Sequence, residues 1–209
     1  MRQANIEEWS KILVYIECRK GKIHPVGREL IAEASRLAKR LGMPVYAAAI
    51  GSDLEEIEGQ LSGCPLERLY LYEAADEYTP LAYEKILADC IKEIKPSIVL
   101  IGGTSEGRAL APRLAVAFET GLTADCTSLE IDEEGNLVQI RPAFGGNVMA
   151  SIVTRFTRPQ FATVRPGVME PACIEGQPAP KIIRRTVHAD EDAFQILEVK
   201  EAKATESIA

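Results

Sequence analysis

The sequence predicts an α/β fold in three layers, with helices covering both faces of a mainly parallel central sheet. Over about the first hundred residues, short aliphatic runs alternate with segments whose apolar residues recur every three to four positions. Prolines and glycines stand at many of the boundaries between these segments. Strand, helix and strand repeated in this order are typical of a parallel sheet built through crossover helices.

The first unit consists of one buried strand and one amphipathic helix. The run KILVYIE at 11–17 is rich in aliphatic residues and predicts the strand. The helix begins at Pro25, and Gly42 is placed to cap its C-terminus. Its apolar residues form one stripe: Leu30, Ala34, Leu37, Ala38 and Leu41. We therefore expect this helix to pack on the strand that precedes it.

The next units repeat the pattern and complete a Rossmann-like, three-layer arrangement. The predicted strands are 45–50, 66–72 and 97–101, and the predicted helices are 53–61, 79–95 and 106–118. The strand SIVLI at 97–101 is apolar throughout, as central parallel strands usually are. Pro112 lies inside the last helix, where it either kinks the helix or marks a restart near position 111.

After Gly121 the pattern changes to short strand candidates separated by turns. These candidates are 129–132, 137–141, 148–156 and 161–164, with possible edge strands at 181–188 and 194–200. We predict that this half is antiparallel and extends or flanks the main sheet. The chain then divides into one α/β domain over 1–189 and a segment over 190–209 that holds the last strand candidate and a linker.

Composition and charge exclude several functional classes. The net charge of −7 and the pI near 5.1 disfavour nucleic-acid binding, because phosphates need a cationic surface. No run approaches the roughly 18 apolar residues of a membrane span, so we expect no membrane insertion. The five cysteines are scattered, without a CxxC pair, and this predicts reduced thiols in a cytoplasmic protein and no metal site.

Catalysis is not expected from this chain. His24 and His188 are its two histidines, and neither lies in a recognised nucleophile motif. Asp125 is the one carboxylate in a small, apolar setting, and we expect it to hydrogen-bond backbone rather than to act as a base.

The best candidate site is the segment GGTSEGR at 102–108, directly after the strand 97–101. Ligands of open α/β sheets favour the carboxyl ends of strands, and helix N-termini attract anions. Thr104, Ser105 and Arg108 are therefore candidates for an anion site or an interface. In the alternative interpretation, Thr104 or Ser105 caps the next helix and the glycines permit a tight turn. The segment matches neither a Walker A motif nor GxGxxG.

Two further groups of residues are weaker candidates. The segment 141–147, RPAFGGN, is either a docking loop or a wide hairpin connection. Arg155, Arg158 and Arg165 recur near prolines, where they either make internal ion pairs and solvent contacts or face an acidic partner.

Four stretches, taken together, resemble the alpha subunit of electron-transfer flavoproteins. They are GGTSEGRALAPRLA at 102–115, TGLTADCTSLEID at 120–132, RPAFGGNVMASI at 141–152 and RPQFATVRPGVM at 158–169. The resemblance implies an N-terminal α/β domain that packs against the beta subunit. It also implies that FAD is held mainly by a second domain, which would follow Ala209, so we expect no flavin on this segment and carry over no flavin-binding residue.

Three functional hypotheses follow. In the first, the chain is the scaffold and subunit-interface domain of a heterodimer that carries electrons on FAD from dehydrogenases to an acceptor. In the second, it is a stand-alone nucleotide-binding module that uses the loop Gly103–Arg108. In the third, the chain self-associates through exposed apolar surface.

Overall fold

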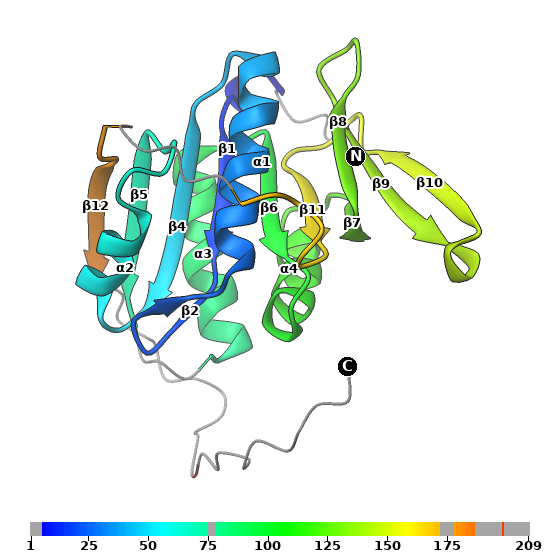
Figure 1. Ribbon diagram of the computed structural model, residues 1–209. Coiled ribbons are helices and arrows are strands. Elements are labelled where there is room, and N and C mark those ends of the chain that lie inside the picture. The colour runs from blue at the N-terminus through cyan, green and yellow to red at the C-terminus, as the bar shows by residue number, and fades with distance from the viewer. Residues whose placement is uncertain (1–5, 75–77, 172–177, 187–197, 199–209) are drawn as a thin grey trace.

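The computed structural model describes residues 6–74, 78–171, 178–186 and 198. Its centre is a seven-stranded sheet in the order β12-β5-β4-β1-β6-β11-β7, shown in Figure 1. Every pairing within this sheet is parallel. The strands are β1 (Ile12–Ile16), β4 (Val45–Gly51), β5 (Arg68–Glu73), β6 (Ile98–Gly102), β7 (Leu122–Cys126), β11 (Gln160–Val164) and β12 (Lys181–Thr186).

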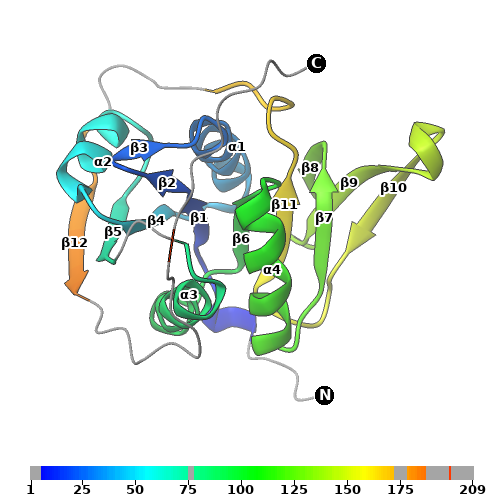
Figure 2. The same cartoon turned by 90° about the horizontal axis from the view of Figure 1, so that it is seen from below.

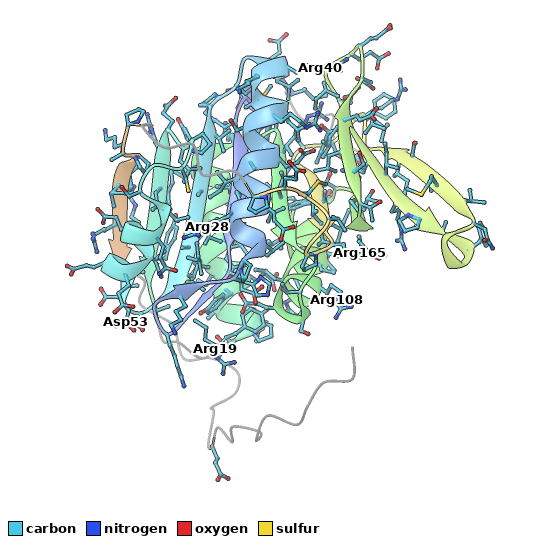
Figure 3. The ribbon with its side chains drawn as sticks, viewed as in Figure 1. Arg19, Arg28, Arg40, Asp53, Arg108 and Arg165 are labelled. Carbon is cyan, nitrogen blue, oxygen red and sulfur yellow. The ribbon has the colours of Figure 1, made fainter. Side chains whose placement is uncertain are left out.

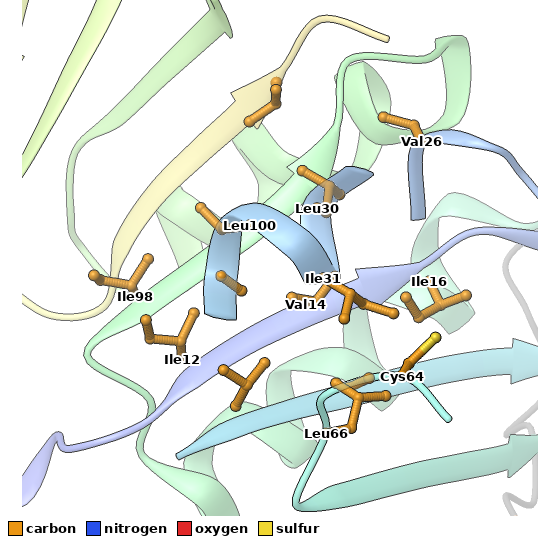
Figure 4. Packing of buried hydrophobic residues seen from close by; sticks show 14 of the residues in the cluster. Ile12, Val14, Ile16, Val26, Leu30, Ile31, Cys64, Leu66, Ile98 and Leu100 are labelled. Atoms are coloured by element: carbon orange, nitrogen blue, oxygen red, sulfur yellow. The ribbon is translucent and has the colours of Figure 1, made fainter. Parts of the chain in front are cut away.

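Four helices cover the two faces of the sheet (Figure 2). They are α1 (Val26–Leu41), α2 (Leu54–Leu61), α3 (Pro80–Ile94) and α4 (Ser105–Ala117). In β1, Val14 faces α1 and α2, whereas Leu13 and Tyr15 face α3 and α4. Figure 4 shows Ile12, Val14 and Ile16 among side chains of the α1 layer. The predicted three-layer α/β/α fold is therefore confirmed.

The helix ends follow the predicted signals closely. Gly42 takes the left-handed conformation (φ 64°) after α1, and its N–H donates to the carbonyl of Ala38. The helix α4 runs without a break through Pro112, so the structure excludes a restart near position 111. Short 3-10 turns precede β1 at Ile6–Glu8 and follow β9 at Phe144–Gly146.

The C-terminal half contains the largest difference between prediction and structure. An antiparallel sheet does form, from β8 (Ser128–Ile131), β9 (Leu137–Ala143) and β10 (Val148–Val153). The strand predicted at 161–164, however, is parallel and lies between β6 and β7. Its assignment to an antiparallel half was wrong, because a short and mostly apolar run carries no information about strand direction.

Two other elements were missed, and one prediction is confirmed in part. Neither β7 nor the small hairpin of β2 (Cys18–Arg19) and β3 (Lys22–Ile23) was predicted from the sequence. The edge strand predicted at 181–188 is present as β12, which pairs with β5 at the outer edge. The strand candidate at 194–200 and the boundary between 189 and 190 lie outside the described residues, apart from residue 198, which has no regular structure.

The antiparallel sheet is the connection between the two parallel neighbours β7 and β11. A helix usually makes such a crossover. Here β9 and β10 leave the body of the domain as a projecting hairpin, at the right of Figure 1. We call residues 137–153 the β9–β10 arm.

Candidate functional site

The carboxyl ends of the parallel strands meet at one edge of the sheet, and the candidate loop at 102–108 lies there. Because β6 has β1 on one side and β11 on the other, this loop is flanked by Glu17 and by Arg165. Figure 3 shows Arg108 and Arg165 at this edge, whereas Arg40 lies at the opposite end of the molecule. We call this region the carboxyl edge.

Thr104 is the N-cap of α4. Its Oγ1 accepts a hydrogen bond from the N–H of Gly107 at 3.0 Å, and its hydroxyl donates to Glu17 Oε2 at 2.5 Å. Arg108 bonds back to the carbonyl of Thr104, through its backbone N–H at 3.0 Å and through Nε at 3.3 Å. Ser105 is exposed in the first turn. The capping interpretation is thus confirmed for Thr104.

The glycines of this loop are required by packing within the domain. A Cβ on Gly107 would lie 1.9 Å from the carbonyl oxygen of Gly102, and one on Gly103 would lie 2.9 Å from that of Val164. A Cβ on Gly102 would lie 2.6 Å from Val26 Cγ1 of α1. The N–H of Gly103 also donates to Val164 at 2.6 Å. These glycines bring helix and strands close together, and the N–H groups of Gly103 and Gly107 are already bonded within the domain.

The electrostatics of the loop disfavour a bound phosphate. Glu106 accepts a hydrogen bond from the hydroxyl of Tyr15 at 2.5 Å. Burial raises the pKa of Glu106 to about 7; the hydrogen bond from Tyr15 lowers it, and the neighbouring Glu17 raises it. Glu17, and Glu106 whenever it is ionised, therefore place negative charge beside the cap, where the pyrophosphate of a nucleotide or flavin would have to bind. The residues present here do not fit such a ligand.

Arginines gather around Asp125 at the end of β7. Arg165 makes two hydrogen bonds to the Asp125 carboxylate, at 2.9 Å and 2.6 Å. This pairing lowers the pKa of Asp125, with smaller contributions from Arg141 and Arg108. We call Arg108, Arg141 and Arg165 the arginine cluster. The expectation that the Asp125 side chain hydrogen-bonds backbone was wrong, since its carboxylate pairs with a guanidinium that comes from a different strand end.

The three arginines that recur near prolines have different roles. Arg155 is exposed and forms an ion pair with Glu134 at 3.0 Å. Arg158 is only 6% exposed, and it donates to Ser97 Oγ at 3.2 Å and to Asn136 Oδ1 at 3.1 Å. It also donates to carbonyls of the segment that precedes it. Burial lowers its pKa. Arg158 therefore links its own segment to Ser97 and Asn136, and its burial leaves it inaccessible to a partner.

The segment 141–147 is a hairpin connection, as one of its two interpretations predicted. Residues 141–143 end β9, and the turn Phe144–Gly146 leads into β10. Phe144 is 85% exposed at the tip. Sequence reasoning missed the exposure of the apolar side chains that follow it, although the lack of charge in this stretch was a visible signal.

A buried carboxylate orders the loop after β11, and it too was missed. Glu29 of α1 is 6% exposed and accepts from the N–H of Gly167 at 2.9 Å and 3.1 Å. It also accepts from the N–H of Met169 at 3.4 Å. Its side chain thus fixes the loop that begins with Arg165 of the arginine cluster.

The described residues give no sign of a metal centre. None of their histidine, cysteine, aspartate and glutamate side chains form a group of three or more that could hold an ion. Burial raises the pKa of Cys90 and of Cys126 to about 12, so these thiols stay protonated at neutral pH. Within the same part of the chain, no helix combines the length and apolar character needed to cross a bilayer.

The fold and this edge define a parallel, three-layer α/β domain in which Thr104 and Gly103 of the candidate loop are bonded within the domain. Residues 12–190 match the family model of the electron transfer flavoprotein domain. The chain belongs to this family, and the resemblance to alpha subunits seen in the sequence is confirmed.

Three curated relatives illustrate the match. The electron transfer flavoprotein subunit alpha of Thermoanaerobacterium thermosaccharolyticum is 40% identical over 203 residues, which are 95% of this chain and 62% of the relative. The protein FixB of Clostridium saccharobutylicum is 42% identical over 82% of this chain and 52% of its own length. The subunit LctC of a lactate dehydrogenase (NAD(+),ferredoxin) of Acetobacterium woodii is 48% identical over 74% of this chain and 37% of its own length. The chain therefore spans between 37% and 62% of these relatives.

Proposed function

We propose that this chain is the N-terminal scaffold and subunit-interface domain of an electron-transfer flavoprotein alpha subunit. The intact protein pairs with a beta subunit and carries electrons on FAD from dehydrogenases to an acceptor. The observation that carries the proposal is the family match over residues 12–190. The names of the relatives, which include subunits alpha and a dehydrogenase subunit, support a role within a larger assembly.

The geometry of the carboxyl edge supports a scaffold role over chemistry within this domain. Thr104 is used as a cap, and the carboxylates of Glu17 and Glu106 occupy its surroundings. In our proposal FAD is held by other parts of the intact protein, and this chain itself catalyses nothing. Ser105 and Arg108, which are exposed at this edge, are interface candidates, and Thr104 positions the helix that carries them.

Two measurements on purified 1–209 test the proposal. The protein is expected to be colourless, and stoichiometric flavin absorbance would contradict the placement of FAD outside this domain. Titration with the electron-transfer flavoprotein beta subunit from the same source is expected to give a complex in sedimentation experiments. Failure to associate at roughly micromolar concentrations would overturn the scaffold role.

A calorimetric titration separates this proposal from the nucleotide-binding module. The family match does not support that alternative, and two carboxylates disfavour it. AMP, ATP and FAD are each expected to give no binding heat with 1–209. Saturable binding of AMP or ATP that is lost in Arg108→Ala would favour the module.

A further inference from the structure

A cavity of about 410 Å³ lies between α2 and β12, at the outer edge of the central sheet. In Figure 1 these two elements lie on the side of the molecule away from the β9–β10 arm. The strands β5, β4 and β1 separate β12 from β6, so the cavity is also distinct from the candidate loop at 102–108. Its volume falls in the range of roughly 300 to 1,000 Å³ that is typical of small-molecule sites.

One face of α2 lines the cavity along its length. Glu55, Glu58, Gly59 and Ser62 all border the cavity, and successive members of this set are one to four positions apart. Residues three or four positions apart share one side of a helix. The rise from residue 55 to residue 62 is about 10 Å. The cavity is therefore elongated along the helix and suits a linear ligand.

A glycine keeps the middle of the cavity open. Gly59 lies in the interior of α2, where glycine weakens a helix relative to alanine. No described atom lies within 4 Å of the position that its Cβ would take, so packing does not require a glycine there. This is the reverse of Gly107 in α4, whose Cβ would clash with the carbonyl oxygen of Gly102. At Gly59 the missing side chain leaves space for a ligand.

The charges along the cavity indicate the chemistry of that ligand. Glu55 is exposed and has no ion-pair partner among the described residues. The next carboxylate, Glu58, accepts a hydrogen bond from Arg184 of β12 at 2.6 Å, and this ion pair leaves the middle of the cavity without net charge. Pro180 and Ile182 add an apolar surface beside the ion pair. One end of the cavity is thus anionic and its middle is neutral and partly apolar.

The far end of the cavity also favours a cation. Ser62 is the C-cap residue of α2, and it is exposed. The C-terminus of a helix carries partial negative charge, and a serine hydroxyl oxygen can accept a hydrogen bond from an ammonium group. The cavity therefore offers negative charge at each end and an apolar surface between the ends.

We propose that this cavity, which we call the α2–β12 groove, binds a linear aliphatic diamine or polyamine. One ammonium group lies against Glu55, the methylene chain crosses Gly59 and Ile182, and a second ammonium group lies near Ser62 at the end of α2. The inference is independent of the proposed function, because it uses none of the residues of the carboxyl edge.

Calorimetric titration of spermidine into 1–209 tests the proposal with two groove variants and two matched controls. Gly59→Leu fills the middle of the groove and is compared with Ala109→Leu on the exposed side of α4. Glu55→Gln removes the free carboxylate and is compared with Glu133→Gln, which removes an exposed carboxylate from the turn after β8. Thermal unfolding first shows that each variant is folded. Magnesium chloride at matched ionic strength controls for counterion screening.

We expect spermidine to bind at one site with a dissociation constant of about 1 mM or lower. Gly59→Leu should weaken binding by about tenfold or more through steric exclusion, and Glu55→Gln by about threefold or more. Both controls should bind within about twofold of the parent chain. The two groove variants act by different means, so Glu55→Gln remains a sufficient test if Gly59→Leu does not fold.

Three outcomes would overturn the inference. The first is the absence of saturable binding, and the second is equal binding by the groove variants and their controls. The third is a heat that magnesium chloride reproduces, which would show that spermidine only screens the acidic surface. A lysine side chain of another protein carries the same ammonium group, so a lysine peptide with blocked ends is titrated as well. Tighter binding of that peptide than of spermidine would assign the groove to a protein and overturn its assignment to a free amine.

Discussion

The carboxyl edge and the β9–β10 arm differ in whether their side chains are bonded within the domain or exposed to solvent. At the carboxyl edge, the N–H of Gly103 is bonded to Val164, and Thr104 is bonded to both Glu17 and Gly107. On the arm, Phe144 and Met149 extend into solvent. The glycines of the loop at 102–108 are therefore used for packing, whereas the arm, whose one charged residue is Arg141, exposes apolar side chains.

The largest expected effect comes from Gly107→Ala, which would disrupt the packing of α4 against the end of β6 at the carboxyl edge. The new Cβ would lie 1.9 Å from the carbonyl oxygen of Gly102 and 2.9 Å from Ile101 Cγ2. We expect the free energy of unfolding to fall by about 3 kcal/mol or more, measured by urea denaturation. Gly59→Ala in α2 is the control, since nothing lies within 4 Å of its Cβ position. That change is expected to stabilise the protein slightly, and an equal loss in both variants would contradict the packing argument.

The next effect is a pH dependence that belongs to the carboxyl edge. Burial raises the pKa of Glu106 from 4.5 to about 7 in the folded protein, so the native state binds this proton more tightly than the unfolded chain. The contribution of Glu106 to stability is therefore fully present below pH 4.5 and is lost as the pH rises to about 7. It amounts to at most about 3 kcal/mol.

The matched variant for this dependence is Glu106→Gln, which keeps an oxygen as acceptor for Tyr15. We expect its free energy of unfolding to vary less between pH 5 and pH 7 than that of the parent chain. Denaturation series at several pH values measure the difference. Parallel curves for the two proteins would mean that Glu106 does not titrate in this range.

A third substitution probes the base of the arm. Arg158→Met removes the donors to Ser97 and Asn136 and leaves these buried groups without partners. We expect a loss of about 2 kcal/mol in the free energy of unfolding. Arg155→Met, at an exposed ion pair, is expected to cost less than about 1 kcal/mol. Similar losses in the two variants would show that burial of Arg158 does not matter.

The smallest expected effect is on the arm itself. Met149→Lys changes an exposed side chain that has little to lose on unfolding, so the free energy of unfolding should change by about 0.5 kcal/mol or less. Denaturation of the chain without partner checks this. A loss comparable to that of Gly107→Ala would show that Met149 is packed in solution, and it would remove the contrast between the two regions.

The sequence was sufficient for most of the parallel sheet. The strands β1, β4 and β6 are short aliphatic runs buried on both faces, so they were located to within about a residue or two. The strand β7 was missed because Thr123 and Asp125 interrupt its apolar pattern. The direction of β11 was not predictable, because its neighbours β6 and β7 are distant in the sequence.

The candidate loop was located correctly, but its neighbours were not foreseen. Thr104 was identified both as a cap and as an anion ligand, and the sequence left the two possibilities open. Glu17, which follows β1, accepts the hydrogen bond from Thr104 and disfavours an anion there. Contacts of this kind depend on strand order, which local periodicity does not encode. The contact of Glu29 with Gly167 could not be predicted either, because it also depends on which strands are neighbours.

The position of β11 has a consequence for biosynthesis. The residues of β6 and β7 are synthesised before those of β11. In the complete sheet β6 and β7 are not neighbours, because β11 pairs with both of them. Until the ribosome has released β11, the facing edges of β6 and β7 both lack their partner. Unpaired strand edges of this kind promote aggregation of nascent chains. Nascent chains that end within the β9–β10 arm should therefore depend most on chaperones.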